Sequence, residues 1–281
     1  MMRPKTKILI RKIVIQIFAL LFIGFMLLPV YQMLLTALRP ADLSWESPSN
    51  LLPNQVTLKN FAKAFELVPR FPRYLLNSFI YGIGVSLISL AIAIPAGYAL
   101  ARFRFIMKKP IMIFVIYANM FAPIMLLVPI YVIMDKIGVI DTYFSVILAG
   151  SIFTIPLSTW LTVSYMQGIP KEIEDAAFVD GCNHFNIIPK VVLPLMGPAL
   201  VAIFIYSFIT GWSQQFILAL VLVKNDKLMP IAQGLYQFFS RSSVRWNELM
   251  AAILLSTLVP IILFLVVQKY IVKGLTSGSI K

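Results

Sequence analysis

The sequence predicts an all-α integral membrane protein with six transmembrane helices. Hydrophobic residues make up 60% of its 281 residues and charged residues only 12%, a composition far from that of a soluble domain. The apolar residues gather in runs long enough to cross a bilayer, and the basic residues lie between those runs. A mean hydropathy of +0.89 agrees with lipid as the main solvent of the chain.

Each predicted helix corresponds to one uncharged apolar run. A helix needs about 20 mostly apolar residues to cross the hydrocarbon core of a bilayer. Together the runs define a membrane domain over residues 13–268, and in chain order they cover residues 13–38, 74–101, 110–134, 142–168, 191–223 and 249–268. In the fifth run, Gly197 and Pro198 indicate that the membrane part begins after them.

The basic residues predict the orientation. Residues 1–12 carry several lysines and arginines, and such residues stay on the cytoplasmic side. No cleavage pattern follows the first run, so we expect a retained helix instead of a secretory signal. Six crossings then place the tail, residues 269–281, in the cytoplasm as well. They place residues 39–73 outside, with a short helix in "LKNFAKAFELV", and residues 167–194 inside.

The sequence argues against two classes of protein, ion-driven carriers and enzymes. All Asp, Glu, Lys and Arg residues lie outside the six runs. A charge at a helix centre costs about 2.5–3.5 kcal/mol, and proton- or sodium-driven carriers accept that cost because a titrating acid couples them to the ion. The chain also lacks a G-x-x-x-x-G-K-[ST] stretch and a Ser/His/Asp or paired-carboxylate set, so we predict neither nucleotide binding of that kind nor a catalytic residue.

The remaining composition excludes further chemistry. A single cysteine, Cys182, and a single histidine, His184, supply neither an internal disulfide nor a metal site. The net charge of +13 is spread between apolar segments, where anionic lipid headgroups are its expected partners. Nucleic acid is not expected to bind, because the basic residues do not gather on a polar domain with interleaved aromatic residues.

Uncharged polar residues do enter the runs, and they permit two interpretations. They could form hydrogen bonds between helices. Alternatively, they could line a path for a polyhydroxylated solute such as a sugar. The candidates for such a translocation path are Asn119, Ser158, Trp212, Ser213, Gln214 and Gln215.

The cytoplasmic segment 167–194 contains the most polar stretch between two runs. Its sequence "GIPKEIEDAAFVDG" predicts a short helix, with Pro170 in the first turn, acids at the positive N-terminal end and Gly181 as a left-handed stop. Helical spacing places four residues on one face: Ile173, Ala176, Ala177 and Asp180. A helix lying on the membrane surface is the alternative, but such helices are normally basic, so a protein partner explains the acids better.

The same segment resembles the cytoplasmic loop of the permease subunits of ATP-binding-cassette importers. That loop follows the pattern E-A-A, three residues, G, nine residues, I-x-L-P. This chain has Asp175-Ala176-Ala177, then Gly181, then nine residues before Val191, and the same spacing to Leu193-Pro194. Asp175 replaces the usual Glu, and Glu174 precedes it, so the resemblance leaves both acids as candidates for the main contact with an ATPase.

Further stretches resemble the sugar-uptake group that includes the second permease subunit of maltose-type importers. They are "NSFIYGIGVSLISLAIAIPAGYALARFRF", "LLVPIYVIMDKIGVIDTYFSVIL", "GWSQQFILALVL" and "QKYIVKGLTSGSIK". Where this group more usually has Trp-Asn, the chain has Trp212-Ser213, within the segment that could line the path.

The resemblance implies a type I ABC importer permease fold in the cytoplasmic membrane of a bacterium or archaeon, with both termini in the cytoplasm. It implies a heterodimer with a second, homologous permease, two ATPase subunits that use ATP and Mg²⁺, and an extracytoplasmic solute-binding protein, while this chain itself binds no cofactor. The implied cargo is a mono-, di- or oligosaccharide, with a polyol or glycerol phosphate as the alternative cargo. A passive channel subunit is the alternative function. The implied coupling residues are Glu174, Asp175, Ala176, Ala177, Asp180, Gly181, Leu193 and Pro194.

Overall fold

The computed structural model describes residues 4–40, 55–239 and 244–277. Within these ranges the chain forms helices and turns, with one isolated antiparallel bridge between Phe239 and Val244, so the all-α prediction is confirmed. The chain divides into two compact units. The first combines residues 1–69 with 235–256, and the second combines residues 70–234 with 257–281.

Among the described residues, five helices are long and apolar enough to cross a membrane, and a bent helix pair makes a sixth candidate. The long helices begin and end close to the predicted runs, except that the first and last continue into the basic leader and the tail. Their bounds are α1 (Pro4–Leu38), α3 (Phe71–Arg102), α6 (Tyr143–Gln167), α10 (Gly197–Leu222) and α12 (Trp246–Ser277). Parts of the leader, the outer loop and the tail lie outside the described residues, namely residues 1–3, 41–54 and 278–281.

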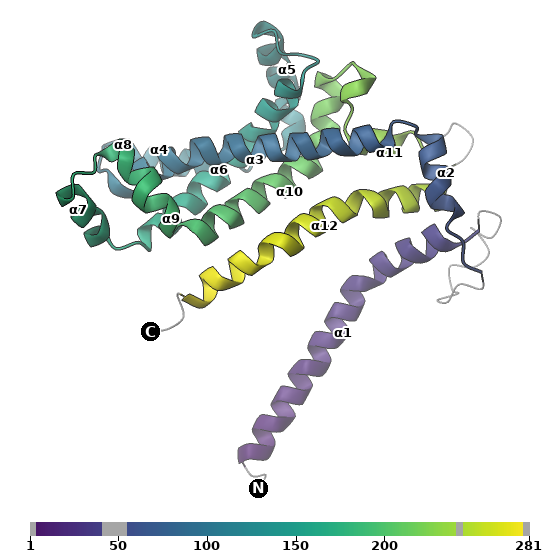
Figure 1. The fold of residues 1–281 in the computed structure, drawn as a ribbon, viewed down its shortest axis with the longest axis horizontal. Helices are drawn as coiled ribbons and strands as arrows, with labels where there is room; N and C mark the ends of the chain where they lie inside the picture. Colours follow the sequence, from purple (N-terminus) through teal and green to yellow (C-terminus); the bar gives the residue numbers. More distant parts are fainter. Residues whose placement is uncertain (1–3, 41–54, 240–243, 278–281) are drawn as a thin grey trace. The chain divides into compact units, whose positions relative to one another are not determined.

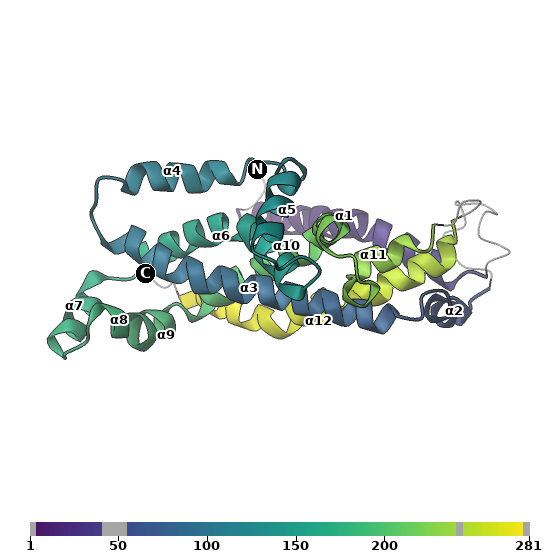
Figure 2. The ribbon, with the colours of Figure 1, turned by 90° about the horizontal axis from the view of Figure 1, so that it is seen from above.

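The third run, residues 110–134, is not the single straight helix that its hydropathy predicts. It forms α4 (Lys108–Ala118), then the 3₁₀ turn η2 (Pro123–Leu126) and α5 (Leu127–Lys136), and the two parts are bent by 106° (Figure 2). Pro123 explains the break. A proline pushes the preceding residue out of the helical region, and Ala122 is extended at φ −65° and ψ 131°.

Helices α3, α6 and α10 pack together and form the core of the second unit (Figure 1). Glycine lets α3 approach α6 closely. A Cβ atom added at Gly97 would overlap the Thr162 side chain and would lie 3.4 Å from the backbone nitrogen of Val163. Hydrogen bonds add to this packing, since the Ser89 and Thr154 hydroxyls lie 2.5 Å apart between the same helices. Small residues and neutral hydrogen bonds are typical of contacts between membrane helices.

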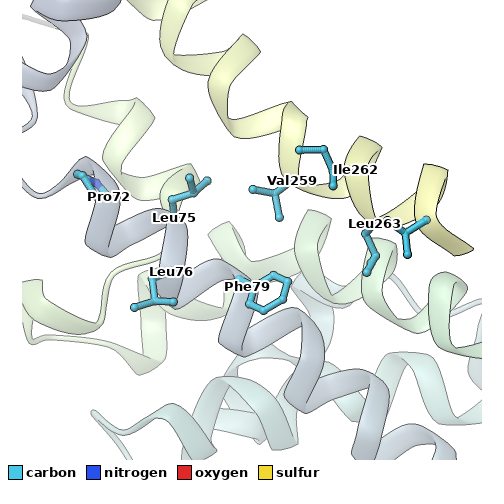
Figure 3. Close-up of a pocket in the computed structure, with 8 residues that line it drawn as sticks. Pro72, Leu75, Leu76, Phe79, Val259, Ile262 and Leu263 are labelled. Atoms are coloured by element: carbon cyan, nitrogen blue, oxygen red, sulfur yellow. The ribbon is translucent and has the colours of Figure 1, made fainter.

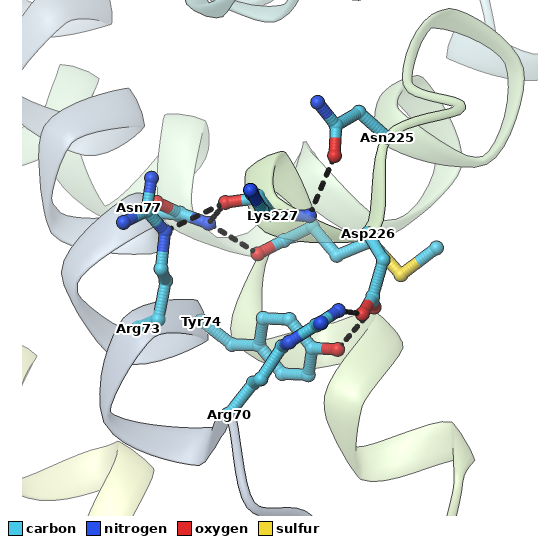
Figure 4. Close-up of polar contacts among 8 residues, drawn as sticks. Arg70, Arg73, Tyr74, Asn77, Asn225, Asp226 and Lys227 are labelled. Carbon is cyan, nitrogen blue, oxygen red and sulfur yellow. Dashed lines mark hydrogen bonds and ion pairs between the residues drawn. The ribbon is translucent and has the colours of Figure 1, made fainter.

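A polar network at the N-terminal end of α3 holds the segment that follows α10, which contains η4 (Asp226–Leu228) and α11 (Ile231–Tyr236) (Figure 4). Buried Asn77 donates hydrogen bonds to the carbonyls of Lys227 and Met229, at 2.9 and 2.8 Å. Its own carbonyl accepts a hydrogen bond of 2.7 Å from Tyr143. Asp226 accepts a hydrogen bond from the Tyr74 hydroxyl and pairs with Arg70. Since Asn77 uses both polar atoms, it joins α3, α6 and this outer segment.

In the first unit, α2 (Lys59–Leu67) confirms the short helix predicted in the outer segment. Asn60 of α2 is buried and donates hydrogen bonds to the carbonyls of Ala37 and Arg39, at 2.8 and 2.7 Å. Asn247, in the first turn of α12, donates to the same Arg39 carbonyl at 2.8 Å. The end of α1 therefore forms a shared hydrogen-bonding point for α2 and the start of α12.

Candidate functional site

The polar loop between α6 and α10 folds as the short helix α7 (Lys171–Val179), followed by α8 (His184–Ile187), the π-helical turn η3 (Ile188–Val192) and α9 (Leu193–Leu195). In Figure 1 these elements lie together at one end of the helix bundle, the end that the sequence predicts to be cytoplasmic. The C-terminal end of α3 is at the same place.

Both ends of α7 follow from its sequence. Pro170 is extended at φ −56° and ψ 135° and directly precedes the helix, one position earlier than predicted. Glu172 and Glu174 lie in the first turn, where the helix dipole favours negative charge. Gly181 takes the left-handed conformation at φ +87°, and its N–H donates to the Phe178 carbonyl at 3.1 Å, which confirms it as the stop. The Cys182 N–H completes this C-terminal motif by donating to the Ala177 carbonyl at 3.0 Å.

One face of α7 packs on the bundle. Ala177 is buried in a cluster that joins the ends of α3, α6 and the segment leading into α10. The other buried members of this cluster are Tyr98, Met166, Ile187, Val192, Met196 and Ala199. Two of the predicted coupling residues lie in α9, where Leu193 is half-buried and Pro194 is exposed.

Glu174 lies on the same buried face and is held by two residues of α3. Its Oε1 accepts a hydrogen bond from Arg102 Nε at 2.6 Å and lies 2.5 Å from Nη2 of the same guanidinium. Its Oε2 accepts a hydrogen bond of 3.2 Å from the Tyr98 hydroxyl. Arg102 Nη2 also donates to the Ile169 carbonyl at 3.0 Å, just before α7. The side chains of Arg102 and Glu174 are only 9% and 6% exposed, so this is a buried ion pair.

The opposite face of α7 is exposed. It carries residues at positions i, i+3, i+4 and i+7, which we call the outer face: Glu172, Asp175, Ala176 and Val179. Val179 is 88% exposed. Within the part of the chain that the structure describes, the Asp175 carboxylate has neither an ion pair nor a hydrogen bond.

Ile173, Ala176, Ala177 and Asp180 follow one side of α7 and its C-cap at helical spacing, as predicted, but that side is not uniformly exposed. Ala177 is turned into the bundle, whereas Ala176, Ile173 and Asp180 are exposed. Adjacent residues of a helix point about 100° apart, and the buried ion pair determines which of them faces inward. Sequence reasoning also missed Arg102 and Tyr98. Both lie at the end of the second run that the sequence predicts to be cytoplasmic, but nothing in the sequence paired them with Glu174.

The six candidates for the translocation path lie in different surroundings. Ser158 is buried, and its hydroxyl lies 3.1 Å from that of Ser207, which favours the alternative of helix-to-helix hydrogen bonding. Gln215 is also buried and donates to the Ser78 carbonyl at 2.9 Å. Their assignment to a path stays a prediction.

The other four path candidates are less enclosed. Half-buried Trp212 lies against Phe208, with ring centroids 5.7 Å apart. Exposed Ser213 donates to the Thr210 carbonyl at 3.0 Å, and Gln214 is half-buried. Asn119 lines a pocket of about 330 Å³ with Ile116, Leu157 and Trp160.

A second groove is purely apolar in its side chains. It has a volume of about 500 Å³ and lies between α3 and α12 (Figure 3). Its lining consists of Pro72, Leu75, Leu76, Phe79, Val259, Ile262, Leu263 and Val266. Because these side chains offer neither a hydrogen-bond donor nor an acceptor, the groove is unsuited to a polyhydroxylated solute.

The long apolar helices define a multi-pass membrane protein, and the small helix α7 carries an acidic outer face. The chain belongs to the family described as binding-protein-dependent transport system inner membrane components, whose sequence pattern matches residues 93–277. This match confirms the resemblance to ABC importer permeases.

Relatives match over most of their length. The chain is 30% identical to the inner membrane ABC transporter permease protein YcjP of Escherichia coli, over 93% of each chain. It is 32% identical to the trehalose/maltose transport system permease protein MalG of Thermococcus litoralis, over 83% of this chain and 84% of the relative. It is 31% identical to the diacetylchitobiose uptake system permease protein DasC of Streptomyces coelicolor, over 93% and 94% of the two chains.

Solved structures share the fold. A chain of a bacterial ABC transporter involved in the import of the acidic polysaccharide alginate superposes with a TM-score of 0.74 at 22% identity, covering 96% of this chain and 99% of the other. A chain of the MetNI methionine ABC transporter gives a TM-score of 0.57 at 17% identity, covering 75% and 96%. The predicted ABC importer permease fold is therefore confirmed.

Proposed function

We propose that the chain is a permease subunit of an ATP-driven importer for sugars, in the cytoplasmic membrane of a bacterium or archaeon. The proposed cargo rests on one observation. The chain matches, over more than four fifths of its length, permeases named for trehalose and maltose and for diacetylchitobiose. A permease named for arabinooligosaccharides adds to it, at 29% identity over 92% of this chain. All three names refer to di- or oligosaccharides.

The energy for transport comes from partner subunits in this proposal. Two ATPase subunits use ATP and Mg²⁺, and this chain hydrolyses no nucleotide and holds no cofactor. A second, homologous permease completes the path, and an extracytoplasmic binding protein delivers the sugar. The uncharged runs support this division, since they carry no titrating acid that could couple uptake to an ion gradient.

The outer face of α7 is the proposed docking surface for one ATPase. Its carboxylates suit basic side chains, and Ala176 and Val179 suit an apolar groove, which is a common way for a protein to bind a helix. An exposed ion pair contributes only about 0–1 kcal/mol. We therefore expect the apolar contacts of Val179 to carry more of the binding free energy than the charges.

The test is uptake by the complete complex reconstituted in liposomes, with its binding protein outside and ATP inside. We expect ATP-dependent accumulation of a labelled di- or oligosaccharide from a panel of maltose, trehalose, chitobiose, arabinotriose and glycerol 3-phosphate. Liposomes with ADP inside are the control. Equilibration of the solute without ATP would show a passive channel and refute the proposal. ATP-driven uptake of glycerol 3-phosphate alone would show that the cargo is not a sugar.

A further inference from the structure

We propose that Glu174 is a positioning residue that fastens α7 to the cytoplasmic end of α3, and that Asp175 is the acid that meets the ATPase. This inference rests on the proposed function, because it assigns separate roles to two neighbouring acids of the docking helix. It also names Arg102 and Tyr98 as members of the coupling apparatus.

The surroundings of Glu174 leave it unable to meet a second protein. Its side chain is 6% exposed, and both carboxylate oxygens are used, one by Arg102 and the other by Tyr98. A basic side chain of an ATPase would first have to break this buried pair. A carboxylate leaves a buried partner only at a large cost, because the guanidinium then stays charged without compensation.

Arg102 holds α7 at two points. Its guanidinium contacts Glu174 in the first turn of α7 and also the carbonyl of Ile169, just before α7 begins. The planar, rigid guanidinium fixes direction as well as distance, which a flexible ammonium group would not do. Arg102 is the last residue of α3, and α3 packs along α6 and α10. A push on α7 therefore passes directly to the helix that organises the bundle.

The pair is needed for this transmission because α7 has little other attachment on its buried face. Besides Glu174, that face has Ala177 as a buried residue and half-buried Phe178, which packs against the same cluster. A methyl group packed in a cluster resists separation but resists sliding weakly, whereas a two-point ion pair resists both. Without the pair, we expect α7 to shift against α3 when an ATPase pulls on it.

Asp175, one position further on, has the opposite surroundings. Its side chain is exposed on the outer face beside Val179, and the structure gives it no ion pair or hydrogen bond within the described residues. It can therefore accept a basic side chain without breaking an existing contact. This assignment decides between the two acids that the sequence leaves equivalent.

The test uses the complete complex and compares Glu174→Gln and Asp175→Asn, which remove one acid each without changing side-chain size. Spin labels at the exposed positions Lys171, outside the outer face of α7, and Arg104 report the position of α7 relative to the end of α3. We expect Glu174→Gln to broaden the distance distribution and to lower the sugar moved per ATP by about tenfold or more, with the ATPases still bound. We expect Asp175→Asn to leave the distribution unchanged and to weaken retention of the ATPases.

A double variant, Glu174→Gln with Arg102→Gln, separates positioning from stability. Removing both charges avoids an unpaired buried ion, so its unfolding temperature is expected to return toward that of the wild type. Its coupling ratio is expected to stay low. If the double variant regained both stability and coupling, or if Glu174→Gln released the ATPases and Asp175→Asn did not, the inference would be overturned. The distances are measured without transport, so they test the inference even if the wild type moves no sugar, the result that would refute the proposed function.

Discussion

Replacing Val179 with alanine is expected to weaken binding of the ATPase by about 15-fold. Val179 is 88% exposed at the end of α7, so the change costs the isolated chain almost nothing, and alanine keeps the helix. Docking would bury the side chain. Each buried CH₂-sized group contributes about 0.8 kcal/mol, so the two carbons that are removed account for about 1.6 kcal/mol of the binding free energy. Since 1.4 kcal/mol is a factor of ten, this gives the expected change in Kd.

The assay is equilibrium binding of the purified ATPase subunit to the chain in lipid nanodiscs. Val56→Ala is the matched control, because Val56 is 63% exposed but lies in the segment predicted to be outside. Its Kd should equal that of the wild type. If Val179→Ala bound within twofold of the wild type, or if both variants weakened binding equally, the outer face of α7 would not be the docking surface.

Three further substitutions test the contact of α3 with α6, the polar network around Asn77 and the C-terminal stop of α7. Gly97→Val places a side chain into Thr162 at the contact of α3 with α6. We expect it to lower the free energy of unfolding by about 1–3 kcal/mol, measured by titration with a denaturing detergent. The control Gly24→Val, where a Cβ atom meets nothing within 4 Å, should leave the free energy of unfolding unchanged. Asn77→Asp keeps the shape but removes two hydrogen-bond donors, so it should cost about 1–3 kcal/mol and expose residues 223–231 to protease. Gly181→Val forces a branched side chain into a left-handed backbone, which should cost about 1–2 kcal/mol and speed amide exchange in the last turn of α7; unchanged exchange would contradict the stop.

The long helices could be predicted because hydrophobic length is a property of the sequence itself. The break between α4 and α5 could not be predicted from hydropathy, which ignores backbone geometry. Pro123 was the available clue, since the residue before a proline avoids the helical region. The helical part of the basic leader and of the tail was missed for a related reason, because a helix does not have to end where its hydrophobic residues end.

The candidate site was predictable in its helix but not in its orientation. Glycine and the acids fixed the ends of α7, and the structure confirms both ends within one residue. The inward face could not be inferred, because it depends on Arg102, which is 72 positions away from Glu174 in the chain. Two neighbouring acids look equivalent in a sequence, and only the position of a distant guanidinium makes one of them internal.

Native mass spectrometry of the complex tests the central claim most directly. The chain would be tagged, purified from its own membranes in mild detergent and weighed intact. The account predicts one copy of this chain, one copy of a different permease and two ATPase subunits. A stable single chain or homomer without any nucleotide-binding subunit would contradict it.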